Sequence, residues 1–158
     1  MEKITSFTID HIRLQTGLYV SRVDCAGQEK ITTFDIRMTR PNVEPVMDTA
    51  AVHAIEHLGA TWLRNDPQWK DRVLYFGPMG CRTGFYLILR DSVSHEQAIA
   101  LVKEAFAFSA AFEGEIPGAK KIECGNYLEH DLSAARQEAA AYLDVLAHCT
   151  PDTLTYPD

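Results

Sequence analysis

Alternation of hydrophobic and polar residues predicts four β-strands. In residues 31–38, apolar side chains at even positions alternate with polar ones at odd positions from Thr33 onward. This period of two is typical of a strand with one buried face, and it places Arg37 on the opposite, solvent-exposed face. A turn around Gly27 predicts a hairpin between this strand and the one before it. The other three predicted strands cover residues 18–25, 72–76 and 84–90.

Capping residues and turn signals predict three α-helices. Asp48 is a suitable N-cap for the first, and the segment from Ser94 to Gln97 has the capping-box pattern that starts the second. The predicted helices cover residues 48–64, 94–112 and 132–148. The order of elements, ββαββαα, predicts an α+β fold, in which helices pack on one face of an antiparallel sheet. Because no helix remains for the other face, we expect a partner subunit to cover it.

Length and charge limit the class of protein. The 158 residues suit a single domain, 1–158, whose C-terminal tail begins at about residue 150. Fifteen Lys and Arg residues against 22 Asp and Glu residues give a net charge of −7, which argues against nucleic-acid and polybasic membrane partners. No apolar run reaches the roughly 18 residues of a membrane span, and the N-terminus lacks the apolar block of a signal peptide. We therefore expect a cytoplasmic protein.

The most informative motif is His53-Ala-Ile-Glu56-His57. In a helix, residues four apart lie one turn apart on the same face, so His53 and His57 can bind one metal ion. Glu56 would lie beside this pair as a carboxylate able to move protons next to the metal, in the arrangement of the inverzincin motif. The alternative is two solvent-facing histidines on an amphipathic helix, and the motif alone does not decide between the two interpretations.

Two cysteines are candidates for the rest of such a site. Cys124 is a candidate third ligand, and a set of two imidazoles and one thiolate leaves a coordination position open, as in catalytic sites. Cys81 lies in a Gly-rich loop between two predicted strands, where Arg82 would favour the reactive thiolate form. Each has a structural alternative: Cys124 could be a small buried side chain, and Cys81 a structural cysteine at the start of a strand. His130 and His148 are interpreted as surface histidines.

Five ordered stretches of the chain match one known family. They are Ser6-Phe-Thr-Ile-Asp-His11, Phe34-Asp-Ile-Arg37 followed by Pro41-Asn42, His53-Ala-Ile-Glu56-His57-Leu58, Pro78-Met-Gly-Cys81-Arg-Thr-Gly-Phe85-Tyr86, and Cys124-Gly125 with His130-Asp-Leu. Together they resemble the S-ribosylhomocysteine lyase family, the bacterial LuxS proteins. The resemblance covers nearly the whole chain, to about His148.

This resemblance implies an α+β homodimer formed through the uncovered sheet face, with two active sites at the subunit interface. It also implies one divalent metal ion per subunit, Fe(II) in the cell and often Zn(II) after isolation. Water would occupy the fourth coordination position. The metal ligands implied by the resemblance are His53, His57 and Cys124.

The implied activity is cleavage of S-ribosylhomocysteine to homocysteine and 4,5-dihydroxypentane-2,3-dione, the precursor of the autoinducer-2 signal. Two shifts move the carbonyl group along the sugar, and β-elimination then releases homocysteine. Cys81 suits the base of the carbonyl shifts, and Glu56 suits proton transfer and the elimination. The resemblance assigns contacts with the substrate to Ser6, His11 and Arg37.

The chain departs from the family at residues 75–77, where Tyr-Phe-Gly replaces the usual Asp-Ile-Ser. This change leaves open how the homocysteine end of the substrate is recognised.

Two other functions compete with the lyase. An inverzincin-like metallopeptidase would use Glu56 to activate water, but such enzymes take a glutamate as third ligand and have far longer chains. A non-catalytic metal-binding homologue would leave Cys81 and its glycine loop unexplained.

Overall fold

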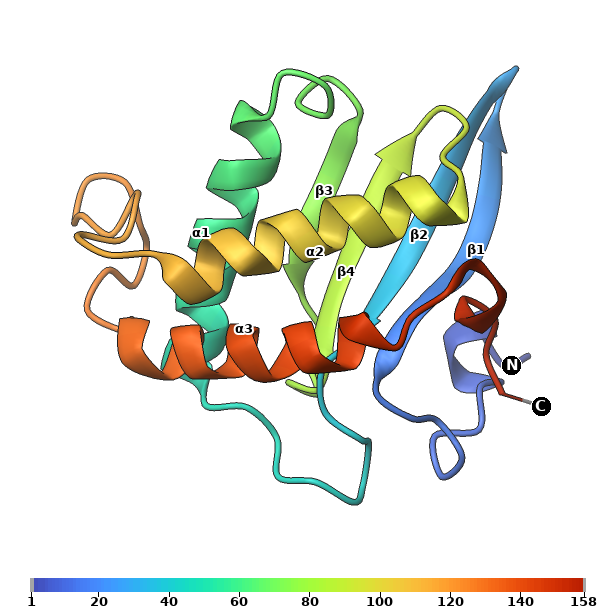
Figure 1. Ribbon diagram of the computed structural model, residues 1–158, viewed down its shortest axis with the longest axis horizontal. Coiled ribbons are helices and arrows are strands. Elements are labelled where there is room, and N and C mark those ends of the chain that lie inside the picture. The colour runs from blue at the N-terminus through green and yellow to red at the C-terminus, as the bar shows by residue number, and fades with distance from the viewer. Residues whose placement is uncertain (1, 158) are drawn as a thin grey trace.

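The computed structural model describes residues 2–157, in which helices cover a β-sheet (Figure 1). The strands are β1 (Gly17–Ala26), β2 (Glu29–Arg37), β3 (Val73–Pro78) and β4 (Gly84–Arg90). The α-helices are α1 (Thr49–Asn65), α2 (His95–Ala111) and α3 (Leu132–Ala147), and the 3-10 turns are η1 (Thr5–Phe7) and η2 (Pro151–Thr153). The predicted strands and helices are confirmed, with bounds that agree to within two residues.

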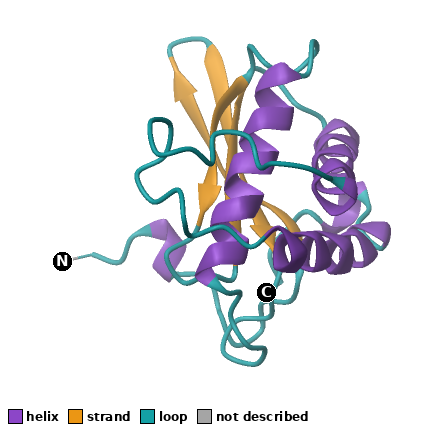
Figure 2. Cartoon of the chain, turned by 90° about the vertical axis from the view of Figure 1, so that its left-hand side faces the viewer, coloured by secondary structure: helices purple, strands orange, loops and turns teal. Residues whose placement is uncertain are grey.

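The strands of the described chain form one antiparallel sheet in the order β1-β2-β4-β3. Helices α2 and α3 run across one face of this sheet, and α1 packs against β3 (Figure 1). After a quarter turn, α2 and α3 are seen to one side of the strands (Figure 2). The predicted α+β class, with helices on one face of an antiparallel sheet, is therefore confirmed. Between residues 2 and 157, no helix has the length and apolar character needed to cross a membrane.

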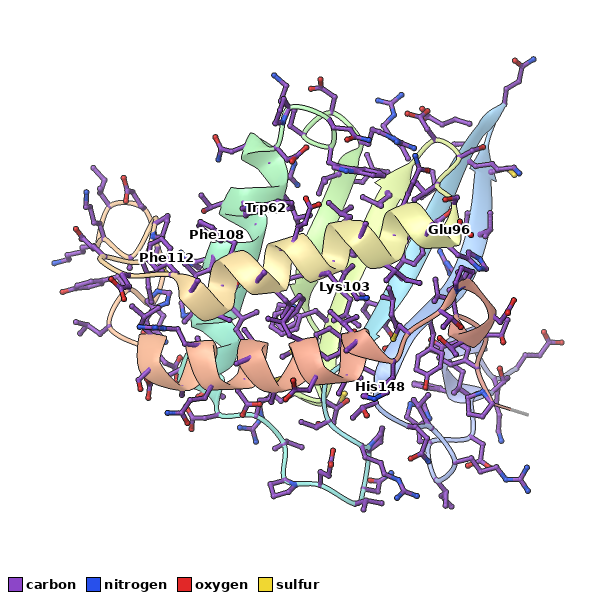
Figure 3. All side chains as sticks on the ribbon, in the orientation of Figure 1. Trp62, Glu96, Lys103, Phe108, Phe112 and His148 are labelled. Atoms are coloured by element: carbon purple, nitrogen blue, oxygen red, sulfur yellow. The ribbon has the colours of Figure 1, made fainter. Side chains whose placement is uncertain are left out.

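The predicted caps are present where the helices begin. Asp48 Oδ1 accepts a hydrogen bond from the backbone N–H of Ala50 at 2.9 Å, which satisfies one free N–H at the start of α1. Ser94 and Gln97 form the reciprocal capping box that starts α2. Figure 3 shows the far end of α2, where Phe112 lies next to the loop that leads to α3.

A close contact at Gly59 sets the position of α1 on the sheet. A Cβ atom on Gly59 would lie 2.5 Å from Cε1 of the Phe76 ring of β3, so glycine alone permits this approach. Phe76 stacks on Phe85 of β4, with ring centroids 5.1 Å apart, and Leu58 beside Gly59 is fully buried. Because both rings lie in the packed core, α1 and the histidines that it carries are held at one height above the strands.

One prediction about β2 is wrong. The alternation of residues predicts exposed positions for Asp35 and Arg37, but their side chains are 0% and 2% exposed. Arg37 Nη2 donates to Asp35 Oδ2 at 2.6 Å, so the two charges neutralise each other. The residues lie two positions apart on one face of the strand, where each supplies the partner that the other needs out of water. The alternating pattern correctly places both residues away from the core, but they are paired with each other instead of being exposed to water.

The Gly59 contact leads to a prediction about stability. Replacing Gly59 by alanine should lower the free energy of unfolding by about 1–3 kcal/mol, because the new methyl group overlaps the Phe76 ring and overpacks the core. The loss should outweigh the intrinsic helix preference of alanine over glycine, which is at most about 1 kcal/mol. Urea unfolding measures the change. Gly80→Ala is the control, because a Cβ there has no neighbour within 4 Å. Equal stability of the two variants would contradict the packing argument.

Candidate metal centre and active site

Two histidines of α1 and a cysteine of the loop between α2 and α3 converge on one point. His53 and His57 lie one turn apart with ring centroids separated by 4.8 Å, and Cys124 Sγ lies 3.4 Å from His53 Nε2. Donor atoms of these three residues and of His130 all lie within 4.8 Å of one another. Imidazole and thiolate donors suit a divalent transition metal, so this cluster can hold one metal ion.

Backbone carbonyl groups orient the two α1 histidines. His53 Nδ1 lies 2.9 Å from the carbonyl oxygen of Glu129, and His57 Nδ1 lies 2.8 Å from that of Pro117. A carbonyl oxygen can only accept, so each Nδ1 carries the ring proton and each Nε2 keeps a free lone pair for a metal. This outer hydrogen bond is the usual companion of a metal-binding histidine.

His130 belongs to the same cluster, so its interpretation as a surface histidine is wrong. Its ring stacks on that of His53 with centroids 3.9 Å apart, and its Nε2 lies 3.9 Å from Cys124 Sγ. Burial lowers the pKa of the His130 imidazole, and the neighbouring His53 and His57 rings lower it further, so the neutral ring is favoured. Its buried Nδ1 has no hydrogen-bond partner within residues 2–157, unlike those of His53 and His57. The proximity of His130 to Cys124 in the sequence is the signal that could have included it.

A cavity of about 350 Å³ lies beside the cluster. His53 and Glu56 of α1 line one part of it, and residues 78–80 with Arg82 line another. The loop that carries Cys81 therefore faces the same space as the carboxylate of Glu56. A cavity of this size is typical of small-molecule sites.

Thr83 connects Cys81 with Arg37. Arg37 Nη1 donates to Thr83 Oγ1 at 2.6 Å, and Thr83 Oγ1 lies 3.1 Å from Cys81 Sγ. Because a guanidinium group only donates, Thr83 accepts from Arg37, and its own proton is available to a thiolate at Cys81. Burial alone would lower the pKa of the Arg37 guanidinium, but the charge and hydrogen bond of Asp35 outweigh burial and raise it. The cation linked to Cys81 is thus Arg37, whereas Arg82, expected from the sequence, donates to a backbone carbonyl.

Ser6 and His11 lie outside the cavity beside the metal cluster. Ser6 lines a separate cavity of about 260 Å³ on the sheet face away from the helices, together with Tyr75 and Tyr86. His11 Nδ1 lies 2.8 Å from the carbonyl oxygen of residue 9. The N-terminal segment precedes β1, whereas α1 packs against β3 at the opposite edge of the sheet (Figure 1). Of the three residues that the resemblance assigns to the substrate, this chain brings only Arg37 towards Cys81.

The unusual residues 75–77 are explained in part by their packing. Phe76 points into the core, and Tyr75 lies on the opposite face with 45% of its surface exposed. A Cβ atom on Gly77 would lie 2.2 Å from the Tyr75 hydroxyl oxygen, so the tyrosine ring folds over a glycine that leaves room for it. Tyr75 and Gly77 therefore depend on each other, and Tyr75 forms part of the cavity that contains Ser6.

Within residues 2–157, the fold and this cluster define a small α+β protein with a candidate catalytic metal centre. The profile of the family described as S-Ribosylhomocysteinase (LuxS) matches residues 4–151. A Phocaeicola vulgatus protein named S-ribosylhomocysteine lyase is 56% identical over 99% of this chain and 98% of its own. Proteins of the same name from Clostridium beijerinckii and Porphyromonas gingivalis are 54% and 52% identical, over 100% of both chains. The chain belongs to the S-ribosylhomocysteinase (LuxS) family.

The geometry of the cluster leads to a prediction about metal binding. Replacing His57 or Cys124 by alanine should weaken metal binding by more than about 100-fold, the upper end of what the loss of an outer-shell contact costs. Elemental analysis after loading with Co(II) gives the metal content, and loss of the thiolate-to-cobalt absorption should accompany Cys124→Ala.

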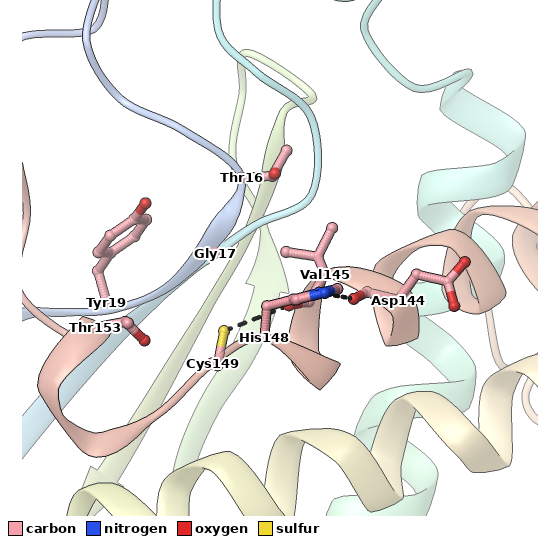
Figure 4. A pocket seen from close by; sticks show the side chains of 8 residues that line it. All are labelled: Thr16, Gly17, Tyr19, Asp144, Val145, His148, Cys149 and Thr153. Atoms are coloured by element: carbon pink, nitrogen blue, oxygen red, sulfur yellow. Dashed lines mark hydrogen bonds between the residues drawn. The ribbon is translucent and has the colours of Figure 1, made fainter.

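The matched control for metal binding is His148→Ala. His148 lies at the end of α3 (Figure 3), where its side chain is exposed. Its Nδ1 is hydrogen-bonded to the Asp144 carbonyl oxygen (Figure 4). This variant should bind metal as the unmodified protein does. One metal per chain in both His57→Ala and Cys124→Ala would show that the ion is held elsewhere.

Proposed function

We propose that this protein is an S-ribosylhomocysteine lyase, which cleaves its substrate to homocysteine and the autoinducer-2 precursor 4,5-dihydroxypentane-2,3-dione. The observation that carries the proposal is the shared cavity at the cluster. A carboxylate, Glu56, and the loop of a cysteine, Cys81, face the same space beside a His, His, Cys ligand set. Family membership and full-length relatives named for this activity support it.

His53, His57 and Cys124 would hold the metal ion, with the remaining coordination position open to the substrate. When bound, the ion supplies Lewis acidity at the carbonyl oxygen of the substrate. We infer Fe(II), with Zn(II) able to replace it, because imidazole and thiolate donors accept both. The donor set fits such an ion, since two Nε2 atoms and one sulfur are free to converge.

Cys81 and Glu56 carry the proton transfers in this proposal. The Cys81 thiolate removes the proton on carbon 2 of the open-chain aldehyde, and a proton returned to carbon 1 moves the carbonyl group to carbon 2. A second transfer of the same kind moves the carbonyl group to carbon 3. The proton on carbon 4 is then acidic, and Glu56 removes it as the bond from carbon 5 to sulfur breaks. Homocysteine leaves as its thiolate.

The proposal includes a homodimer through the sheet face that the helices leave open, in which Ser6 and His11 complete the site of the partner subunit. Both residues lie in the N-terminal segment, away from the cluster of their own chain. Large apolar side chains flank them and are more than half exposed, as expected of residues that a partner covers. They are Ile4 at 57%, Phe7 at 70% and Ile12 at 76%.

The other functions and the cellular location follow from the same residues. A metallopeptidase is not favoured, because its third ligand would be a glutamate and this cluster offers Cys124. A non-catalytic homologue would not need a cation linked to Cys81. We place the protein in the cytoplasm, because a thiolate ligand and a thiolate base both require reduced cysteine.

The assignment of proton-transfer residues is tested by turnover. Metal-loaded protein should release free thiol from S-ribosylhomocysteine, measured with a chromogenic disulfide reagent. Cys81→Ala and Glu56→Gln should each lower the rate roughly 100- to 10,000-fold, because each removes a proton carrier. Both variants should keep the metal, which separates loss of chemistry from loss of the ion. No thiol release from the metal-loaded parent protein would overturn the proposed activity.

Mixed dimers test the shared site. A Cys81→Ala chain and a Ser6→Ala/His11→Ala chain are each expected to be nearly inactive alone. After random mixing, half of the dimers contain both chains, and each of these has one intact site if the site is shared. Activity should then recover to about a quarter of the unmodified value. No recovery, with mixed dimers demonstrated by mass, would place all these residues in the site of a single chain.

A further inference from the structure

The C-terminal tail reaches the buried ion pair of β2. The Tyr156 hydroxyl donates to Asp35 Oδ2 at 2.8 Å, and its ring stacks on Tyr19 of β1 with centroids 5.0 Å apart. The tail is anchored just before this point, because Val20 N–H donates to the carbonyl oxygen of Leu154 at 2.8 Å. Figure 4 shows the hollow beside this anchor, with Tyr19 on one strand and Thr153 at the start of the tail.

Tyr156 stands at one end of a continuous series of hydrogen bonds whose other end is Cys81. Tyr156 donates to Asp35, and Asp35 also accepts from Arg37 Nη2 at 2.6 Å. Arg37 Nη1 donates to Thr83, and Thr83 lies within hydrogen-bond distance of Cys81. A carboxylate only accepts and a guanidinium only donates, so the directions of the bonds among Tyr156, Asp35, Arg37 and Thr83 are determined. With Cys81 as a thiolate, the Thr83 hydroxyl is the donor to the sulfur.

We propose that Tyr156 is a positioning residue for Cys81, which acts through Asp35, Arg37 and Thr83. Its hydroxyl holds the Asp35 carboxylate so that Arg37 keeps one nitrogen on Asp35 and the other on Thr83. Its effect on turnover rests on the proposed function, but its effect on the Cys81 sulfur does not.

The contacts of the Asp35 and Arg37 ion pair explain why its arrangement depends on the Tyr156 hydroxyl. Within residues 2–157, Asp35 Oδ1 and Arg37 Nε are buried and have no hydrogen-bond partner. Among the described residues, Tyr156 gives Asp35 its neutral hydrogen-bond donor. Without it, the carboxylate can turn so that Oδ1 also pairs with Arg37 Nε, in the two-bond arrangement that this pair favours. The guanidinium group shifts together with the turned carboxylate, which lengthens the bond from Arg37 Nη1 to Thr83 and weakens the effect of the positive charge on the Cys81 sulfur.

The phenol groups around the network stay protonated near neutral pH. Burial raises the pKa of tyrosines of β1, β4, α3 and the tail, and the charge of Asp35 raises each further. These residues are Tyr19, Tyr86, Tyr142 and Tyr156. The charged groups that face the network are Asp35 and Arg37, with Arg82 next to Cys81 in its loop. Because these tyrosines do not ionise near neutral pH, a change in the pH dependence of Cys81 alkylation reflects a change in its link to the Arg37 charge.

Alkylation of Cys81 tests the proposal in the metal-loaded protein. Tyr156→Phe keeps the ring that stacks on Tyr19 and removes only the hydroxyl. Iodoacetamide labelling of the Cys81 peptide, followed by mass spectrometry across a pH series, should be several-fold slower in this variant at neutral pH. Its half-maximal rate should lie at higher pH than in the parent protein. Tyr19→Phe is the matched control, because that hydroxyl donates to the Gln15 carbonyl oxygen and should leave the profile unchanged.

Variants of Thr83 test the same proposal if Tyr156→Phe does not fold. Thr83→Val breaks the last link and should slow labelling in the same direction, whereas Thr83→Ser keeps the hydroxyl and should behave as the parent protein. An unchanged profile, or one shifted to lower pH, in folded Tyr156→Phe would overturn the proposal, as would a normal profile in Thr83→Val. In the turnover assay, Tyr156→Phe should lower kcat and leave KM unchanged. If the parent protein does not turn over S-ribosylhomocysteine, the proposed function fails while the labelling experiment still decides the role of Tyr156.

Discussion

The buried ion pair of Asp35 and Arg37 is the constraint around which the open face of the sheet is organised. Both side chains are out of water, so each charge requires an opposite charge and further hydrogen bonds. Strand β2 brings the pair together, but the other bonds come from Thr83, just before β4, and from Tyr156 of the tail. The loop of Cys81 and the C-terminal tail are thus positioned by the need to satisfy two desolvated charges.

The metal cluster depends on a different kind of contact. Its histidines lie on α1, whose position on the sheet is set by Gly59 against Phe76, while Cys124 comes from a loop far along the chain. The backbone carbonyl groups that orient the histidines belong to that same loop region. A packed core therefore positions half of the cluster, and loop hydrogen bonds position the rest. The metal cluster and the loop of Cys81 lie next to the same cavity, which α1 and this loop line from different sides.

Local patterns predicted most of the fold. Alternation identified the strands, and the caps at Asp48 and Ser94 identified helix starts, because both depend on neighbours within a few residues. The exposure of Arg37 was predicted wrongly, since alternation cannot distinguish a solvated charge from a paired one. His130 was misassigned for a related reason: its ring stacks on that of His53, which is distant in sequence, and the nearby Cys124 alone does not reveal that contact.

The sequence by itself determined the secondary structure, the fold class, the family and the His53 and His57 pair, because helical spacing places residues four apart on one face. The tertiary structure alone decided that Arg37, and not Arg82, is the cation linked to Cys81, and that Tyr156 completes its hydrogen bonds. Long-range partners of a buried charge depend on which segments the core brings together. No spacing along the chain records that arrangement.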